Sequence, residues 1–485
     1  MKRRLKQLGR DSLVYGLGGV FAKSIGFFLL PVYTRIFSPA DYGTIEMLTV
    51  LAGFLSMLLQ MGMDSAQSFY FFEQKNSGHS AQTAVVSAIV QWRILWGTVI
   101  VVCATLLSPV LNYFFFQGKL TWEYFAIAFV GVLFSQLVSQ SAEVFRLLYK
   151  PWRFIGITLG NTVVSSAVAL VLILMLGLGI KGYLAGSLAG SLISTGLGWF
   201  YIREFLDFSK LHKDWWPRLL KFGAPLVPSG LAIYVLNTSD RWFVSHYAGQ
   251  EALGLYAVGA KFAMVIALAV TTFRQAWWPI AMDSMHGDDG PVLFRTIGRL
   301  YLGCGVACVV LLTAISPYIV RWLTPPEYYG AYPLIGVLAW YSVFYGFYLI
   351  GAGGIWKAEK TAVLPLLAGA AAVLNVVLDA ILVPSMGGMG AAVATSISFL
   401  IWNVLVLAIS EKLWAVRYPF GRMILQVVLG IVATGYILFS YSQKAAFVQV
   451  GPFAALVILL VLMMSVPKKQ LFAAWGSARS FVGRR

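Results

Sequence analysis

The chain has 485 residues, of which 59% are hydrophobic and only 11% are charged. A soluble globular domain carries about 25% charged residues, so this composition excludes an ordinary soluble protein and predicts an integral membrane protein. The net charge of +17 comes from basic residues that are spread over many short connections. This dispersal argues against nucleic-acid binding, which needs a concentrated basic patch.

Apolar stretches long enough to cross a bilayer recur along the whole sequence, since a membrane-spanning helix needs about 20 apolar residues. The pattern predicts an all-α polytopic membrane protein with about 14 transmembrane helices. The first six spans are placed at roughly 12–37, 42–70, 82–109, 121–146, 153–177 and 180–202. The other eight are placed at roughly 217–241, 252–279, 292–322, 329–355, 361–383, 387–410, 420–441 and 447–466.

The positions of the basic residues predict the orientation in the membrane. Most of the 36 Lys and Arg residues fall in the connections on one side and in the two terminal segments. Cytoplasmic loops carry an excess of Lys and Arg, so both termini are expected in the cytoplasm. The basic N-terminus is expected to be retained with the first span and not cleaved as a signal peptide.

The first six spans and the next six share sequence features. Residues 35–45 and 240–256 each place an arginine at the end of one span and a glycine and tyrosine at the start of the next. Residues 179–187 and 387–395 share a G-x-x-G-x-x-x-[GA]-[ST] pattern. These matches predict a duplicated chain, which would place a substrate site near the membrane midplane, between the two halves.

Three basic residues, Lys23, Arg93 and Lys261, lie inside apolar spans. At 1.5 Å per residue each lies about 14–16 Å deep in a core about 30 Å thick. A charge there costs roughly 3 kcal/mol, so we expect these residues to bind an anionic group. A structural ion pair inside the helix bundle is the alternative for each.

Acidic residues and prolines mark other candidate positions. Glu46 and Asp379 are placed nearer the outer face, where they are expected to gate the pathway or couple it to ions, or else to form ordinary ion pairs. Pro225 and Pro228 interrupt the seventh span and predict a hinge, or else a simple packing kink.

The sequence contains no pattern typical of an enzyme. Its histidines show no metal-ligand spacing, and no nucleotide-binding motif precedes a helix. We therefore expect no catalytic residue, no metal and no cofactor. The three cysteines lie within spans and are expected to pack as small apolar residues.

Residues 34–43 (TRIFSPADYG) and 237–243 (NTSDRWF), with the glycine turn before the twelfth span, carry a family resemblance. Over almost its whole length the chain resembles the Wzx-type flippases, the polysaccharide-transport branch of the multidrug/oligosaccharidyl-lipid/polysaccharide exporter superfamily. The resemblance implies two six-helix lobes in a V-shaped arrangement, at 1–210 and 211–412. Residues 413–485 would form two peripheral C-terminal helices and a basic tail.

The resemblance also implies a function. The expected substrate is an oligosaccharide repeat unit on undecaprenyl diphosphate, moved by alternating access to the outer leaflet of the bacterial inner membrane. The product would serve O-antigen, capsule or exopolysaccharide synthesis, with a polymerase and a chain-length regulator as possible partners. Residues expected to bind the diphosphate are Lys23, Arg93, Lys261 and, nearer the cytoplasm, Arg274. Residues expected to form the outer gate or couple to protons are Arg35, Glu46, Asp240, Arg241 and Asp379.

Three other functions remain open at this point. A lipid II-type flippase of the same superfamily also needs a basic cavity. A cation-coupled drug exporter is expected to carry carboxylates at mid-membrane instead. A membrane-embedded glycan ligase is expected to have a long outer loop with catalytic residues, whereas the outer loops here are short.

Overall fold

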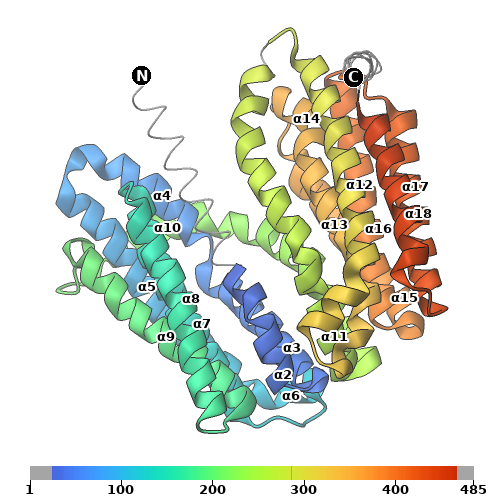
Figure 1. The fold of residues 1–485 in the computed structure, drawn as a ribbon. Helices are drawn as coiled ribbons and strands as arrows, with labels where there is room; N and C mark the ends of the chain where they lie inside the picture. Colours follow the sequence, from blue (N-terminus) through green and yellow to red (C-terminus); the bar gives the residue numbers. More distant parts are fainter. Residues whose placement is uncertain (1–23, 286, 467–485) are drawn as a thin grey trace, which may run out of the picture. The chain divides into compact units, whose positions relative to one another are not determined.

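The computed structural model describes residues 24–285 and 287–466, and in these ranges all regular structure is helical. Eleven of the described helices are long and apolar enough to cross a membrane. The prediction of an all-α polytopic membrane protein is therefore confirmed. The helices fall into two compact units that divide between Gly254 and Leu255 (Figure 1).

The first unit contains the helices that precede the division. Its α-helices are α2 (Leu30–Ile36), α3 (Pro39–Gln60), α4 (Met63–Glu73), α5 (His79–Leu106), α6 (Ser108–Phe116), α7 (Trp122–Leu147), α8 (Pro151–Leu174), α9 (Gly179–Ile202), α10 (Trp216–Gly223) and the first part of α11 (Val227–Ser284). Four short 3₁₀ helices connect them: η1 (Gln74–Ser77), η2 (Arg203–Phe205), η3 (Lys213–Trp215) and η4 (Ala224–Leu226).

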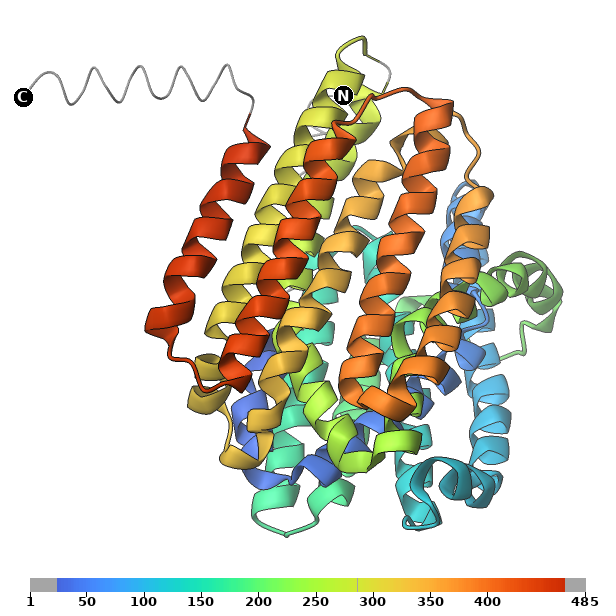
Figure 2. The same ribbon diagram turned by 90° about the vertical axis from the view of Figure 1, so that its right-hand side faces the viewer.

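The second unit contains the rest of α11 and the helices that follow it. These are α12 (Gly290–Leu323), η5 (Pro326–Ala331), α13 (Tyr332–Gly351), α14 (Gly353–Lys357), α15 (Val363–Met386), α16 (Gly388–Leu413), α17 (Phe420–Ser442) and α18 (Phe447–Ser465). Figure 2 shows the long helices of this unit running side by side. α12 is 34 residues long, well beyond the length that a bilayer requires.

The eleven membrane-length helices agree with most of the predicted spans. The predicted seventh span covers α10, η4 and the first part of α11, and the eighth lies within α11. Between them, Gly249 alone departs from helical geometry inside α11 (φ 84°, ψ 175°). The predicted sixth span is α9, a helix of 24 residues that is not among the eleven. Most of the first span lies outside the described residues, so the count of fourteen stays a prediction. The V-shaped arrangement and the lobe boundary at residue 210 also stay predictions.

Local sequence explains how α3 begins. Ser38 is its N-cap, with extended backbone, and the Asp41 backbone amide donates to the Ser38 hydroxyl at 3.2 Å. The Asp41 carboxylate in turn accepts from the backbone amide and the hydroxyl of Ser38, which completes a capping box, and Pro39 is at the first helical position. The S-P-A-D sequence therefore ends one span and starts the next within a few residues.

The two glycine patterns have the same role in the two units. Gly179 and Gly387 adopt left-handed backbone (φ 51° and 55°) at the turns before α9 and α16. In the first unit, a Cβ on Gly186 would collide with the backbone of Ala169 on α8. In the second unit, a Cβ on Gly390 would meet the Leu382 backbone on α15. Each hairpin therefore depends on glycine both for its turn and for close helix packing.

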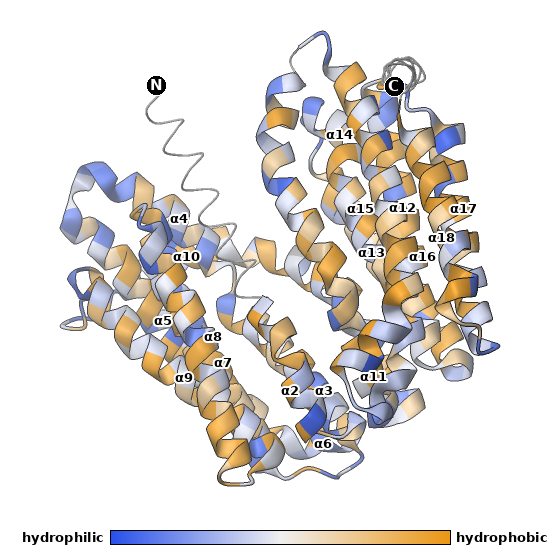
Figure 3. Ribbon diagram, in the orientation of Figure 1, coloured by the Kyte–Doolittle hydropathy of each residue, from blue (hydrophilic) through white to orange (hydrophobic). Residues whose placement is uncertain are grey.

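Apolar side chains face outward as well as inward. Figure 3 shows hydrophobic residues covering most of the length of the long helices in each unit. Leu174 on α8 is 66% exposed and Val432 on α17 is 60% exposed. Such surfaces are expected where the surrounding solvent is lipid.

Candidate functional site

Two glycines from the matched stretches 35–45 and 240–256 meet at a helix crossing in the first unit. Gly43 lies near the start of α3, and Gly254 lies on α11 just beyond the Gly249 break. A Cβ on Gly43 would collide with the carbonyl oxygen of Gln250, and one on Gly254 with that of Pro39. The backbones of α3 and α11 are thus in direct contact, which only glycine at both positions permits.

A charged cluster lies close to this crossing, between α3 and α11. Arg241 Nε lies 3.5 Å from Glu46 Oε1, and Arg241 Nη1 donates to both carboxylate oxygens of Asp240 at 2.8 Å. The same Nη1 donates to the Asn237 carbonyl at 2.8 Å, one helical turn earlier. Three of the predicted gate residues are therefore brought together around one guanidinium group.

Arg35 is not part of this charged cluster in the described contacts. Its side chain is exposed and its Nη1 donates to the Pro31 carbonyl at 3.1 Å, within its own helix α2. A second contact does link α11 to α3: the Tyr234 hydroxyl donates to the Val50 carbonyl at 2.5 Å. Tyr234 was not predicted from the sequence, because a lone tyrosine in an apolar span usually indicates only packing.

The predicted hinge prolines lie where the seventh span changes helix type. α10 ends at Gly223, the 3₁₀ turn η4 contains Pro225, and α11 begins at Val227 with Pro228 in its first turn. Proline removes a backbone donor and clashes with the preceding turn, so it favours such a break.

A second helix break, not predicted from the sequence, packs against the first. Met61 and Gly62 both have left-handed backbone (φ 47° and 69°) and separate α3 from α4. A Cβ on Gly62 would collide with the Gly223 backbone. The interrupted spans two and seven therefore touch backbone to backbone at their breaks. Discontinuous helices of this kind line the substrate sites of many transporters.

Arg93 is fully buried in the first unit and has a carboxylate partner. Its Nη2 forms an ion pair with Asp64 on α4, and its Nη1 donates to the Gln136 carbonyl on α7 at 2.5 Å. This is the structural ion pair that the sequence analysis gave as the alternative to substrate binding at Arg93.

Three other basic residues were predicted to bind substrate, and the structure describes two of them. Lys23 lies outside the described residues. Lys261 lies on α11 in the second unit and is partly buried, and Arg274 lies on the same helix and is exposed. Asp379 on α15 is fully buried, as is Asn375 one turn before it.

All-helical architecture with eleven described helices of membrane length defines a polytopic membrane protein. The chain belongs to the polysaccharide biosynthesis protein family, whose model matches residues 8–285. The MatE family model matches residues 225–381. The predicted family is thereby confirmed, and with it the prediction that the chain is a transporter and not an enzyme.

Individual relatives are distant. The chain is 23% identical over 283 residues to "Lsg locus putative protein 1" of Haemophilus influenzae, covering 57% of this chain and 66% of that protein. It is 23% identical over 333 residues to the succinoglycan biosynthesis transport protein ExoT of Rhizobium meliloti, covering 64% of this chain and 62% of that protein. The chain thus spans slightly less than two thirds of the length of each relative.

Solved structures share the fold. The inward closed conformation of the lipid II flippase MurJ aligns with a TM-score of 0.70 at 18% identity, covering 93% of this chain and 98% of the other. An inward-facing multidrug resistance MATE family transporter aligns with a TM-score of 0.64 at 12% identity, covering 84% and 95%. These likenesses describe the fold alone.

Proposed function

We propose that this protein moves undecaprenyl-diphosphate-linked oligosaccharide repeat units from the cytoplasmic to the outer leaflet of the bacterial inner membrane by alternating access. The observation that carries the proposal is the placement of Lys23 and Lys261 deep in predicted spans of the two halves, in a member of the polysaccharide biosynthesis protein family. A diphosphate is a double anion, and a lysine inside the membrane stabilises it by charge-assisted hydrogen bonds.

Within this proposal the basic residues have different roles. Lys23 and Lys261 bind the diphosphate, and the exposed Arg274 attracts it on entry from the cytoplasm. Arg93 is a positioning residue, because Asp64 already balances its charge inside the first unit. Arg93 acts on the substrate indirectly, because its ion pair with Asp64 holds α4 against α5.

The acidic residues and helix breaks have proposed roles in the transport cycle. Glu46, Asp240 and Arg241 form the outer gate, where rearrangement of one ion-pair cluster frees α3 from α11. Arg35 contributes to the gate from α2. Asp379, which is fully buried on α15, couples transport to an ion. The breaks at Gly62 and Gly223 supply the bending of spans two and seven.

The proposal is tested by flipping assays on the full-length protein in liposomes with an undecaprenyl-diphosphate-linked oligosaccharide. We expect Lys23→Ala and Lys261→Ala each to lose most transport at matched protein content, since each removes a charge that binds the diphosphate. Lys119→Ala is the matched control, because Lys119 is exposed in the loop between α6 and α7. Unchanged transport in both the Lys23→Ala and the Lys261→Ala variant would overturn the proposed role of these lysines in binding the diphosphate.

A lipid II-type substrate is the second candidate, since the chain shares the fold of the lipid II flippase MurJ. The same liposomes distinguish the two candidates when they contain lipid II instead. Transport of lipid II alone would replace the first proposal. Transport of a cationic drug alone would assign the chain to the other branch, whose family model matches residues 225–381.

A further inference from the structure

Two fully buried glutamines in the first unit have no protein hydrogen-bond partner within the described residues. Both side-chain polar atoms of Gln67 on α4 and of Gln140 on α7 are unpaired, although neither side chain is exposed. Nε of Arg93 and Oε1 of Gln136 are unpaired as well. Buried amides without partners are costly, and native proteins satisfy almost all of them with protein groups or ordered water.

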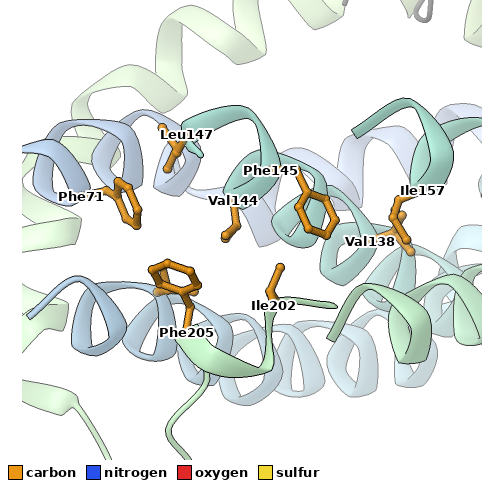
Figure 4. Close-up of a cluster of buried hydrophobic side chains, with 9 residues drawn as sticks. Phe71, Val138, Val144, Phe145, Leu147, Ile157, Ile202 and Phe205 are labelled. Carbon is orange, nitrogen blue, oxygen red and sulfur yellow. The ribbon is translucent and has the colours of Figure 1, made fainter. Parts of the chain in front are cut away.

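The helical spacing places the two glutamines in one layer. Phe71 lies one turn after Gln67, and Val144 lies one turn after Gln140. Phe71 and Val144 point into the same hydrophobic cluster from α4 and α7 (Figure 4). Residues one turn apart share a helix face, so Gln67 and Gln140 both face the space between these helices.

The ion pair lies on the other side of this layer. Asp64 is three residues before Gln67, and Gln136 is four residues before Gln140. Arg93 on α5 contacts both Asp64 and Gln136. The two unpaired amides thus lie between the ion-pair layer and the apolar cluster.

A second carboxylate, that of the buried Glu143, lies on the far side of the glutamine layer beside an exposed arginine. Glu143 follows Gln140 by three residues and accepts from the Ser68 hydroxyl at 2.9 Å. Arg146, whose side chain is 54% exposed, pairs with it at 2.6 Å. The Asp64 side chain is 27% exposed. Asp64 therefore reaches the surface of the unit directly, whereas Glu143, whose side chain is only 9% exposed, is linked to the surface through Arg146.

We propose that bound water molecules connect Glu143 to Asp64 through Gln67 and Gln140, and that protons pass along this chain of hydrogen bonds. Buried water typically makes about three hydrogen bonds to otherwise unsatisfied polar groups, which matches two facing amides. In the step, a proton leaves the Glu143 carboxyl group, is relayed through water, and binds the Asp64 carboxylate. No other covalent bond forms or breaks. Protonation of Asp64 removes its charge and weakens the bond with Arg93.

The charged groups on this face are Asp64 on α4, Arg93 on α5, and Glu143 and Arg146 on α7. α9, which packs on α7, contributes buried hydroxyl groups such as Thr195. The inference does not depend on which lipid-linked substrate is carried, because it concerns the interior of the first unit alone.

The first test measures proton flux into liposomes that contain the full-length protein and an internal pH dye, after an external acid step with potassium and valinomycin present. We expect the wild-type protein to raise the flux above that of protein-free liposomes. The variant Gln67→Leu/Gln140→Leu should return it to the protein-free rate. Gln426→Leu on α17 is the control, because that buried amide already donates to Ser465 and to the Val461 carbonyl. Wild-type flux at the protein-free rate, or undiminished flux in the double variant, would overturn the proposal.

A second measurement on the wild-type protein does not depend on whether the variant folds. Radiolytic hydroxyl labelling modifies side chains next to bound water. Phe71, one turn from Gln67, should be labelled although it is only 2% exposed. Phe129, 1% exposed and about three turns before Gln140 on α7, should not be. Equal absence of label at both residues would contradict the hydrated site.

Discussion

Arg93 carries a full charge inside the first unit, where Asp64 and the Gln136 carbonyl are its partners. Removing one member of a buried ion pair leaves the other uncompensated, at a cost of about 3–5 kcal/mol, whereas replacing both by apolar groups is often neutral. The 27% exposure of Asp64 reduces the cost here, since solvent screens part of its charge.

We therefore expect Arg93→Met to lower the melting temperature of the purified protein, and Arg93→Met/Asp64→Leu to recover much of the loss. Thermal unfolding in detergent, arranged as a double-mutant cycle, measures this coupling. Equal destabilisation by the single and the double variant would show that the pair contributes nothing to stability.

The sequence identified Arg93 but not its partner. A basic residue inside an apolar span can be recognised directly in the sequence. Whether that residue pairs with another side chain or with a substrate depends on which groups its side chain reaches on neighbouring helices. The unpaired Gln67 and Gln140 were missed for a related reason. Glutamine is an ordinary helix-forming residue, and only the complete burial of these two makes them unusual.

Outside the membrane-spanning helices, Asp207 stabilises the loop that follows η2 through hydrogen bonds with Ser209. The hydroxyl and backbone amide of Ser209 donate to its carboxylate and hold the pKa of Asp207 below its ordinary value, and His212 Nε2 lies 3.1 Å from the other oxygen. A folded-state pKa below the unfolded one stabilises the protein above the unfolded value of about 3.9. That stability is lost as the pH falls through the folded value.

We expect Asp207→Asn to lower the melting temperature at neutral pH but to have progressively less effect below about pH 4, where the wild-type carboxylate is protonated too. Melting curves of both proteins from neutral to acidic pH provide the comparison. A difference in melting temperature that does not change with pH would show that the charge of Asp207 is unimportant.

At the scale of helices, the α3–α11 crossing depends on Gly43 and Gly254. Because the neighbouring atoms are backbone, they cannot move aside as a flexible side chain would. Gly43→Ala should reduce the free energy of unfolding by about 1–3 kcal/mol, the usual cost of overpacking. Thermal unfolding measures this effect.

Gly196→Ala on α9 is the control for Gly43→Ala, because a Cβ there meets nothing within 4 Å. Alanine has the higher helix propensity, so this variant should be neutral or stabilising by up to about 1 kcal/mol. If both variants destabilised equally, the cause would be loss of glycine in general and not the helix crossing.

The break in the seventh span should matter for transport more than for folding. Replacing Pro225 and Pro228 by alanine restores two backbone donors and permits a continuous helix through η4. We expect normal yield and melting temperature with markedly slower flipping. Pro452→Ala in α18 is the comparison, since it changes a proline inside the last described helix. Equal flipping rates in the wild-type protein, the Pro225/Pro228 variant and the Pro452→Ala variant would argue against a hinge.

Hydropathy was sufficient to locate nearly every long helix, because each must bury its backbone polar groups in lipid. It did not reveal the Met61–Gly62 break, since one glycine inside a predicted span is common and a methionine with positive φ has no sequence signature. It also missed the contact between Gly62 and Gly223, which are far apart in the chain. Hydropathy reports where helices lie, whereas breaks depend on tertiary packing.

For the whole molecule, the distribution of Lys and Arg predicts that both termini are cytoplasmic. Fusion of a reporter that is fluorescent only in the cytoplasm should therefore give signal at either end. A reporter active only outside the cytoplasm should give signal when inserted between α6 and α7, beside Lys119. The opposite pattern would invert the proposed direction of transport.

The length of α12 has a consequence for the membranes in which the protein works. Arg321 lies 22 residues after Arg299 on α12, and at 1.5 Å per residue the helix rises about 33 Å between them. This distance is close to the hydrocarbon thickness of about 30 Å, so the two arginines would lie at opposite lipid headgroup layers. A bilayer of markedly shorter acyl chains would force the helix to tilt or the lipid to stretch. We therefore expect the rate of transport to depend on the thickness of the membrane.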